Sequence, residues 1–434
     1  MSVPRGFGSA GGWRATGALR RSAVLGVGGL AWGVALGEPA VLVLTVPLLL
    51  MSLPALWRRP ASTPLVETSL LHASLREGEG VALDVTVHDD ADVEQITRIL
   101  TPQPLLVGRP DGGRTVTWGQ KAPRLEVSPR RWGVITVSER VALTSAWSGF
   151  RWGPVSPADR PSTVLPVAPS YDSRAEQTRP RGLVGAHRST QQGQGSELAG
   201  IRAFQPGDRL RRINWRVSAR TGVLHTTTTR AEQDAGLLLV VDLLAEHGAS
   251  GGLDGTTSSL DLTVRAAAAL AEHAAAQGDR VALKPIGGRA RAVPAGVGLR
   301  HLRRILGTLT DVRPGASPYD DLTRIDLRVG AGTTVILLSP LLADAIGTTA
   351  ATLTRRGIPT VVIDTLPDDV VPDVPDRDPG LVDLAWRMRR LDRDGVLSAL
   401  AAIGCPVVPW HGRGTVDDVM RDLGRRAEQP RARQ

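Results

Sequence analysis

The chain has 434 residues, 42% of them hydrophobic, so it is long enough for two or three domains with ordinary cores. Its formal net charge of +9 permits anionic partners such as lipid headgroups, although arginines scattered over a solvated surface give the same total. A Walker-type nucleotide site is excluded, because no Gly-x-x-x-x-Gly-Lys-Ser/Thr loop is present and Lys121 and Lys284 are the only lysines. The single cysteine, Cys405, excludes a disulfide framework and a cysteine-based metal site.

Two apolar segments follow a basic, glycine-rich arm of residues 1–21, which we expect to be disordered. Residues 22–36 and 40–57 carry no charged side chain, and a turn at residues 37–39 separates them. Each is near the short end of what a bilayer span needs, about 17–25 residues. We predict a transmembrane helical hairpin over residues 22–59. A signal peptide and a buried helical pair of a soluble core are the alternatives.

The charges around the two apolar segments predict an orientation. Arginines flank both outer ends of the pair, and none lies in the turn between them. By the positive-inside rule, the N-terminus and the chain after Arg59 should lie in the cytoplasm. We therefore expect a cell-membrane protein with two spans, cytoplasmic soluble domains and contact with the lipid bilayer through residues 22–57.

Residues 60–168 contain short runs of alternating and β-branched residues, as at 81–87 and 134–138, which predict an antiparallel β-sandwich. Asp111-Gly112-Gly113 is expected to form a hairpin turn between two strands. The nearby aspartates, Asp89, Asp90 and Asp92, lack the spacing of a calcium-binding loop, so we favour a solvated turn. Residues 169–195 are rich in Ser, Arg, Gln and Gly, which predicts a flexible linker.

Strands and helices alternate over residues 237–428, which is typical of a mainly parallel sheet covered on both faces. Strands are expected at 237–242, 280–284, 333–338, 360–364 and 406–408. Helices are expected at 260–277, 298–310, 343–356, 397–403 and 416–426, and residues 429–434 form a tail. Ligands of such sheets bind beyond the carboxyl ends of the strands, which places Asp242, Ser339 and Asp364 at the functional rim.

An arginine-rich segment, residues 196–236, precedes this α/β domain. Pro206-Gly207-Asp208 has the composition of a tight turn, and we expect Asp208 to pair with a neighbouring arginine. Ile213 and Trp215 are two residues apart, so in a strand both would face one side. We predict that Trp215 packs between the domains. The segment either braces the domains or presents a docking face.

The residues of this segment resemble the signature of a bacterial family, the domain of unknown function 58. The matching positions are Arg202, Phe204, Pro206, Gly207, Asp208, Arg211, Ile213, Trp215, Ser218, Arg220 and Glu232. Phe204 stands where the family usually has Tyr. The resemblance implies a von Willebrand factor A-like domain preceded by a β-rich segment and a membrane anchor. It also implies partnership with MoxR-type AAA+ ATPases and other membrane proteins.

The same resemblance bears on metal binding. A metal-binding von Willebrand A domain resembles Asp-x-Ser-x-Ser after the first strand, whereas this chain has Asp242-Leu-Leu-Ala-Glu246, and Ser339 stands within a motif that is usually Thr-Asp-Gly. Because Mg²⁺ prefers several oxygen ligands in octahedral geometry, we predict a degenerate site without metal or cofactor. Asp242 and Glu246 are its vestigial residues. Asp242 is interpreted as a loop cap, with Glu246 as replacement ligand the alternative.

No catalytic constellation stands out. Cys405 is interpreted as a packing residue, and the histidines lack metal-binding or catalytic spacing. The sequence therefore predicts a non-enzymatic, membrane-anchored interaction or adaptor module that works with a MoxR-type AAA+ ATPase in envelope-related assembly or maturation. The alternatives are a divalent-metal-dependent enzyme or binding site at the Asp242 rim and, less favoured, nucleic-acid binding through the arginine cluster. We expect no nucleic-acid partner, since the arginines interleave with apolar residues.

Overall fold

The computed structural model divides into two units, residues 1–167 with 251–255, and residues 168–250 with 256–434. It describes residues 5–8, 12–70, 74–119, 121–157, 159–167, 192–205, 213–230, 236–315, 325, 327, 329–330, 332–370, 372, 377–412 and 414–415. The predicted helix at 416–426, the tail and most of the predicted linker lie outside these residues. The end of the predicted linker, residues 192–195, begins strand β14 (Gln192–Ala203) instead.

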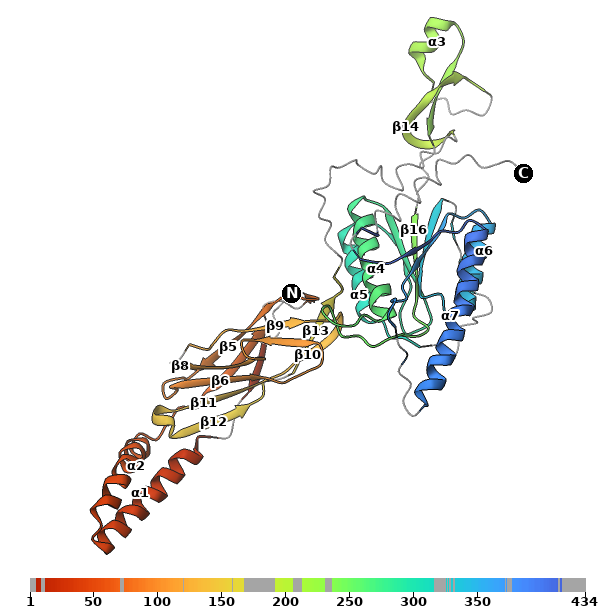
Figure 1. Ribbon diagram of the computed structural model, residues 1–434. Helices are drawn as coiled ribbons and strands as arrows, with labels where there is room; N and C mark the ends of the chain where they lie inside the picture. Colours follow the sequence, from red (N-terminus) through yellow and green to blue (C-terminus); the bar gives the residue numbers. More distant parts are fainter. Residues whose placement is uncertain are drawn as a thin grey trace. The chain divides into compact units, whose positions relative to one another are not determined.

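The N-terminal arm is more ordered than expected, because it contains strands β1 (Arg5–Gly8) and β2 (Arg14–Ala15). Helix α1 (Gly17–Leu36) follows, with Thr16 as its N-cap, and helix α2 (Pro39–Trp57) comes next (Figure 1). Glycines on α1 allow close packing, since a Cβ on Gly33 would lie 2.7 Å from Leu42 of α2. Among the helices that the structure describes, α2 alone is long and apolar enough to cross a membrane.

The strands of the first unit form three sheets. One has the order β1, β3 (Leu65–Leu70), β5 (Val81–His88), β9 (Leu125–Pro129), β7 (Leu106–Arg109). A second has the order β10 (Gly133–Val137), β13 (Arg160–Leu165), β4 (Ser74–Arg76). The third has the order β2, β12 (Phe150–Val155), β11 (Glu139–Thr144), β6 (Gln95–Leu100), β8 (Arg114–Trp118). The predicted strands at 81–87 and 134–138 are thus confirmed as β5 and β10.

Alternating side chains of these strands build the core of the first unit. Val66 and Val85 of the first sheet share a buried cluster with Ile96 and Val141 of the third. The two sheets therefore pack face to face, because each strand turns every second residue inward.

The turn at Asp111-Gly112-Gly113 does not form the predicted hairpin. Strands β7 and β8 flank it, but β7 pairs with β9 and β8 pairs with β6, in different sheets. The carbonyl of Gly113 accepts a hydrogen bond from the Leu100 amide at 2.7 Å. Turn residues predict a reversal of the chain locally, whereas the partner of each strand depends on distant residues.

The second unit contains a six-stranded sheet in the order β18-β17-β16-β19-β20-β21. Its strands are β16 (Gly236–Asp242), β17 (Arg280–Ile286), β18 (Val293–Gly296), β19 (Thr333–Ser339), β20 (Thr360–Asp364) and β21 (Val407–Pro409). All neighbours are parallel except β17 and β18. The predicted, mainly parallel sheet is confirmed, and the antiparallel edge strand β18 was missed.

Within the described residues, four helices cover this sheet. They are α4 (Ser259–Ala276), α5 (Gly298–Thr310), α6 (Asp344–Arg355) and α7 (Pro379–Ala402). Figure 1 shows α4 and α5 on one face and α6 and α7 on the other. Helix α7 begins far before the predicted start at residue 397, since Asp378 caps it by accepting from the Gly380 amide and Pro379 occupies its first turn.

Candidate functional site

The carboxyl ends of β16, β19 and β20 bring the predicted rim residues to one edge of the sheet. The Ser339 hydroxyl donates to Oδ2 of Asp242 at 2.6 Å, and the Leu244 amide donates to Oδ1 at 3.0 Å. The Ser339 hydroxyl in turn accepts from the Leu341 amide at 2.9 Å. Both carboxylate oxygens of Asp242 therefore already have protein donors, and the side chain holds the loop that follows β16.

Burial dominates the electrostatics of Asp242. Loss of solvent raises the pKa of its carboxyl, and the hydrogen bonds from Ser339 and Leu244 only partly offset this rise. The two donors are neutral, so they stabilise the carboxylate less than a guanidinium would. The ionised form of Asp242 is consequently costly in the folded protein.

Glu246, the other vestigial candidate, is directed to the start of α4. The Ser258 hydroxyl donates to Glu246 Oε1 at 2.6 Å and accepts from the Asp261 amide at 3.1 Å. Ser258 and Asp261 form a capping box. Glu246 thus places negative charge at a helix N-terminus, where the helix dipole favours it.

Asp364, the third rim residue, is anchored by α7. Arg393 forms an ion pair with Asp364 Oδ2 and donates through Nε to the Pro340 carbonyl at 2.9 Å. The Leu366 amide donates to Asp364 Oδ1 at 3.0 Å. Sequence reasoning missed Arg393, because the helix that carries it was predicted to begin after it.

His247 follows Glu246 and lies beside α7, with its ring centroid 6.1 Å from that of Trp386. Burial lowers the pKa of the imidazole, and the positive charge of Arg389 lowers it further. Both effects disfavour the protonated form of His247.

The hydrogen bonds at the rim bear on whether a divalent cation could bind there. Mg²⁺ demands near-octahedral coordination by oxygen at about 2.0–2.1 Å, yet the oxygens of Asp242 are bonded to Ser339 and Leu244. Within the described part of the chain, no three His, Cys, Asp or Glu side chains are close enough to share a metal ion.

The second candidate site is the arginine-rich segment, which folds as β14, helix α3 (Trp215–Thr221) and strand β15 (His225–Arg230). Ile213 and Trp215 do not share a strand, because Ile213 forms an isolated bridge with Thr226 and Trp215 begins α3. Asn214 caps α3 by accepting from the Val217 amide at 3.2 Å, so the helix begins at Trp215. The local hydrogen bond of the Asn side chain outweighs the alternation of apolar residues.

Ser218 fixes α3 to β15. Its buried hydroxyl donates to the Asn214 carbonyl at 2.8 Å and accepts from the His225 amide at 2.8 Å. The Asn214 amide donates to the His225 carbonyl at 2.8 Å. Asn214 and His225 were absent from the predicted site residues, although an Asn directly before a helical stretch is a recognisable N-cap signal.

The remaining signature residues have different environments. Ile213 is buried and bridges to Thr226, whereas Trp215 is 68% exposed, and its packing between the domains stays a prediction. The Arg202 guanidinium donates to the Ala203 carbonyl at 3.0 Å, and Phe204 is half-buried. Pro206, Gly207, Asp208, Arg211 and Glu232, with the predicted Asp208 ion pair, lie outside the described residues.

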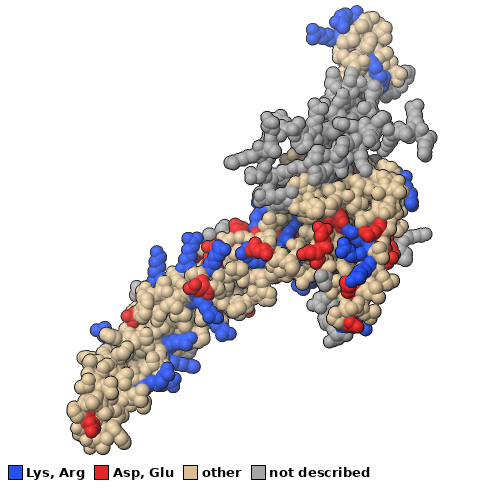
Figure 2. Space-filling model, viewed as in Figure 1, with Lys and Arg blue, Asp and Glu red and all other residues tan. Residues whose placement is uncertain are grey.

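Exposed side chains gather on α3. Trp215, Arg216 and Arg220 are all exposed, and the two arginines lie four residues apart on one side of the helix. We call these three residues the α3 face. Figure 2 shows arginine side chains on the surface of this segment.

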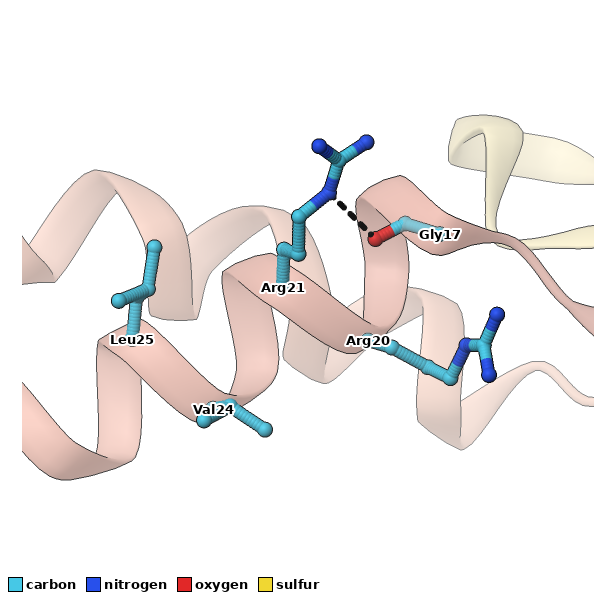
Figure 3. Close-up of a pocket in the computed structure, with 5 residues that line it drawn as sticks. All are labelled: Gly17, Arg20, Arg21, Val24 and Leu25. Carbon is cyan, nitrogen blue, oxygen red and sulfur yellow. Dashed lines mark hydrogen bonds between the residues drawn. The ribbon is translucent and has the colours of Figure 1, made fainter.

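A shallow groove lies at the start of α1, lined by Gly17, Arg20, Arg21, Val24 and Leu25 (Figure 3). Arg21 folds back so that its Nε donates to the Gly17 carbonyl at 3.1 Å. Two guanidinium groups thus lie beside apolar side chains at one end of an otherwise uncharged helix.

A family model described as "Protein of unknown function DUF58" matches residues 200–375. Two similar proteins are Uncharacterized protein Mb1516 of Mycobacterium bovis and Uncharacterized protein Rv1480 of Mycobacterium tuberculosis. Each is 37% identical over 131 residues, which cover 29% of this chain and 39% of the relative. The chain thus spans 39% of the length of these relatives. The family match takes in both α3 and the three rim residues, and through residues 200–375 the chain belongs to the family of proteins of unknown function DUF58.

Proposed function

We propose that this protein is a membrane-anchored protein-interaction module, with the α3 face as its docking surface. The observation that carries the proposal is the 68% exposure of Trp215 on a short helix that also exposes Arg216 and Arg220. Tryptophan and arginine are the residues most enriched among those that dominate binding energy at protein interfaces. The hydrogen bonds of Ser218 and Asn214 hold this face in one conformation, which lowers the entropic cost of binding.

The proposed anchor is a transmembrane hairpin of α1 and α2. Apolar side chains are exposed on both helices, among them Val24, Val34, Val43 and Leu44. Such surface is unfavourable in water and favourable in lipid. Arg20 and Arg21 lie where α1 would reach the headgroups (Figure 3), so their long side chains could extend to the membrane surface. The positive-inside rule then assigns the soluble units to the cytoplasm.

We infer that the α/β unit is von Willebrand A-like with a degenerate metal site, and that it acts by binding rather than catalysis. Support comes from the rim, where Ser339, Leu244 and Ser258 donate to the carboxylates that would otherwise hold an ion. The proposed partner is a MoxR-type AAA+ ATPase acting in envelope-related assembly or maturation. This partner rests on the family resemblance described above.

Crosslinking and pull-down of the tagged full chain from native membranes tests the docking surface. We expect Trp215→Ala to reduce recovery of an AAA+ ATPase about tenfold or more, because an interface hot spot contributes at least about 2 kcal/mol. Trp118→Ala is the matched control, since Trp118 is also a tryptophan and is 69% exposed. Equal recovery with both variants would exclude the α3 face, and the absence of any AAA+ ATPase would exclude the partner.

The melting temperature separates lost docking from lost folding. Because the Trp215 ring is exposed, its truncation should change the free energy of unfolding by no more than about 0.5 kcal/mol. A large drop in the melting temperature would mean that Trp215 is a structural residue.

Cysteine accessibility tests the proposed anchor. Glu38 is exposed between α1 and α2, and Arg59 follows α2. A membrane-impermeant maleimide should label Glu38→Cys in intact spheroplasts, and Arg59→Cys only after the membrane is opened. Native Cys405 is buried and serves as the background in both variants. Labelling of both positions, or of Arg59→Cys alone, from outside would refute the two-span arrangement.

A divalent-metal site at the Asp242 rim is the alternative function. The raised pKa of Asp242 favours it, because functional sites often contain perturbed carboxylates. Calorimetry with Mg²⁺ or Mn²⁺ distinguishes the two, since the interaction module should give no binding heat. Saturable binding that Asp242→Asn abolishes would establish the metal site instead. Binding of nucleic acid that weakens steeply with salt would point to the arginines of α3.

A further inference from the structure

Helix α7 has two sides with different environments. One side packs on its own unit, where Leu400 is buried in the core, Val396 and Leu397 pack against the core cluster, and Trp386 lies beside His247. Arg393 on this side pairs with Asp364. These contacts fix the orientation of the helix on the sheet.

The opposite side of α7 carries an exposed apolar stripe. Its members are Leu381, Leu384, Met388 and Leu391, which are 61%, 55%, 60% and 70% exposed. At 3.6 residues per turn they fall within about 80° of the helix circumference, roughly opposite Trp386 and Arg393. We call these four residues the α7 stripe.

The spacing within the α7 stripe is that of a coiled-coil seam. Successive members are three, four and three residues apart, so Leu381 and Met388 take heptad position a while Leu384 and Leu391 take position d. Core helices of globular domains usually show a wider apolar face that is buried. This stripe is narrow and exposed, and it points away from the core of its unit.

We propose that the α7 stripe is a self-association surface, on which a second copy of this chain packs its own α7 in a parallel two-stranded coiled coil. The charged residues beside the stripe favour a parallel over an antiparallel arrangement of the two helices. In the same heptad frame Arg387 takes position g and Asp392 takes position e of the next heptad. In a parallel pair each g residue contacts the e residue five positions later on the other helix, so Arg387 of each copy faces Asp392 of the other.

An antiparallel pair would be less favourable. There, g positions face g positions, so Arg387 of one copy would meet Arg387 of the second. Arg387 already pairs with Asp383 within its own helix at 2.5 Å. Both side chains of that pair are largely exposed, so the pair stabilises the helix only weakly, and exchange of Asp383 for Asp392 of a second copy is feasible.

Two heptads make a small interface, below the roughly 1,200 Å² of a standard stable complex, so association should be weak and depend on concentration. Association does not have to include formation of the helix, because packing on the sheet already stabilises α7 within a single copy. This inference is independent of the proposed docking at α3. If both proposals hold, a shared membrane would raise the local concentration and favour the parallel orientation.

Disulfide trapping of the full chain in detergent tests the proposal. In a parallel pair Leu384 faces Leu384 of the second copy, so Leu384→Cys should form a covalent dimer under mild oxidation. Leu299→Cys is the matched control, because Leu299 is 70% exposed on α5 and belongs to no such stripe. We expect at least tenfold more dimer for Leu384→Cys. Equal yields would overturn self-association through α7.

A charge-exchange series tests the orientation. Arg387→Asp should lower the association constant of the dimer, measured by analytical ultracentrifugation, about tenfold, since it places an aspartate opposite Asp392 of the second copy. Adding Asp392→Arg should restore association. If the double variant stays monomeric while its circular dichroism matches that of the wild type, the parallel arrangement is wrong. Trapping of a mixed Leu384→Cys and Met388→Cys pair in place of the symmetric one would show an antiparallel dimer and likewise overturn it.

Discussion

Each unit of the protein contains a buried carboxylate on a strand, Glu139 in the first unit and Asp242 in the second, and these two are stabilised in opposite ways. In the first unit Glu139 of β11 accepts from Nε of Arg98 of β6 at 3.0 Å and forms an ion pair with Nη2 of Arg98 at 2.9 Å, and Arg98 also donates to the Pro123 carbonyl at 2.7 Å. In the second unit, among the residues that the structure describes, the hydrogen-bond donors to Asp242 are both neutral, the hydroxyl of Ser339 and the amide of Leu244.

The difference separates a structural ion pair from a carboxyl whose ionisation is costly. An opposite charge compensates the loss of solvent around Glu139, whereas around Asp242 burial outweighs its hydrogen bonds and raises its pKa. Removing one member of the Arg98–Glu139 pair should therefore lower the free energy of unfolding more than removing a donor to Asp242. The following substitutions measure this contrast.

The largest effect is expected for Glu139→Ala. It would leave the fully buried guanidinium of Arg98 without its counter-charge, which costs about 3–5 kcal/mol. Hydrogen exchange should show accelerated opening of β6 and β11 while β16 and β19 keep their protection. The double variant Arg98→Met with Glu139→Leu should recover most of this loss, because an apolar pair needs no charge compensation. If the single variant exchanges like the wild type, the ion pair contributes little.

A smaller loss, about 1–3 kcal/mol, is expected for Ser339→Ala at neutral pH, because Asp242 loses a donor and the Leu341 amide loses an acceptor. Thr352→Ala is the control, since the Thr352 hydroxyl is exposed and donates only to its own helix. The loss should shrink in acid, where Asp242 is protonated and needs the donor less. A loss that is constant with pH would show that Asp242 does not titrate in the folded protein.

The smallest change in stability is expected for substitution of Asp279, a half-buried carboxyl just before β17 whose pKa is shifted by burial. Burial raises its pKa to about 6. The contribution of Asp279 to the stability of the folded state is therefore fully present below the pKa of the unfolded chain, near 4, and is lost as the pH rises through about 6. Asp279→Asn should stabilise the second unit at pH 7.5 by less than about 1 kcal/mol, after allowance for solvent screening. The gain should vanish near pH 4, and a gain independent of pH would exclude titration as its cause.

The strands and helices of the second unit follow closely from local patterns. Gly298–Thr310 and Thr360–Asp364 were predicted with their observed bounds. The start of α7 was missed, although Asp378-Pro379 is a helix-start signal, and with it the pairing of Arg393 to Asp364 was missed. At the candidate site, sequence placed Asp242 and Ser339 on the same rim but could not show that one bonds the other.

The sequence by itself determined the family, the order of the elements in the α/β unit and the position of its rim, because apolar periodicity and capping residues act over only a few neighbouring positions. Tertiary structure alone decided that β7 pairs with β9, that Arg98 meets Glu139, that Trp215 is exposed and that the α7 stripe faces away from the core. Each of these outcomes depends on which residues, far apart in the chain, compete for the same buried space and the same hydrogen-bond partners, and no local pattern records that competition.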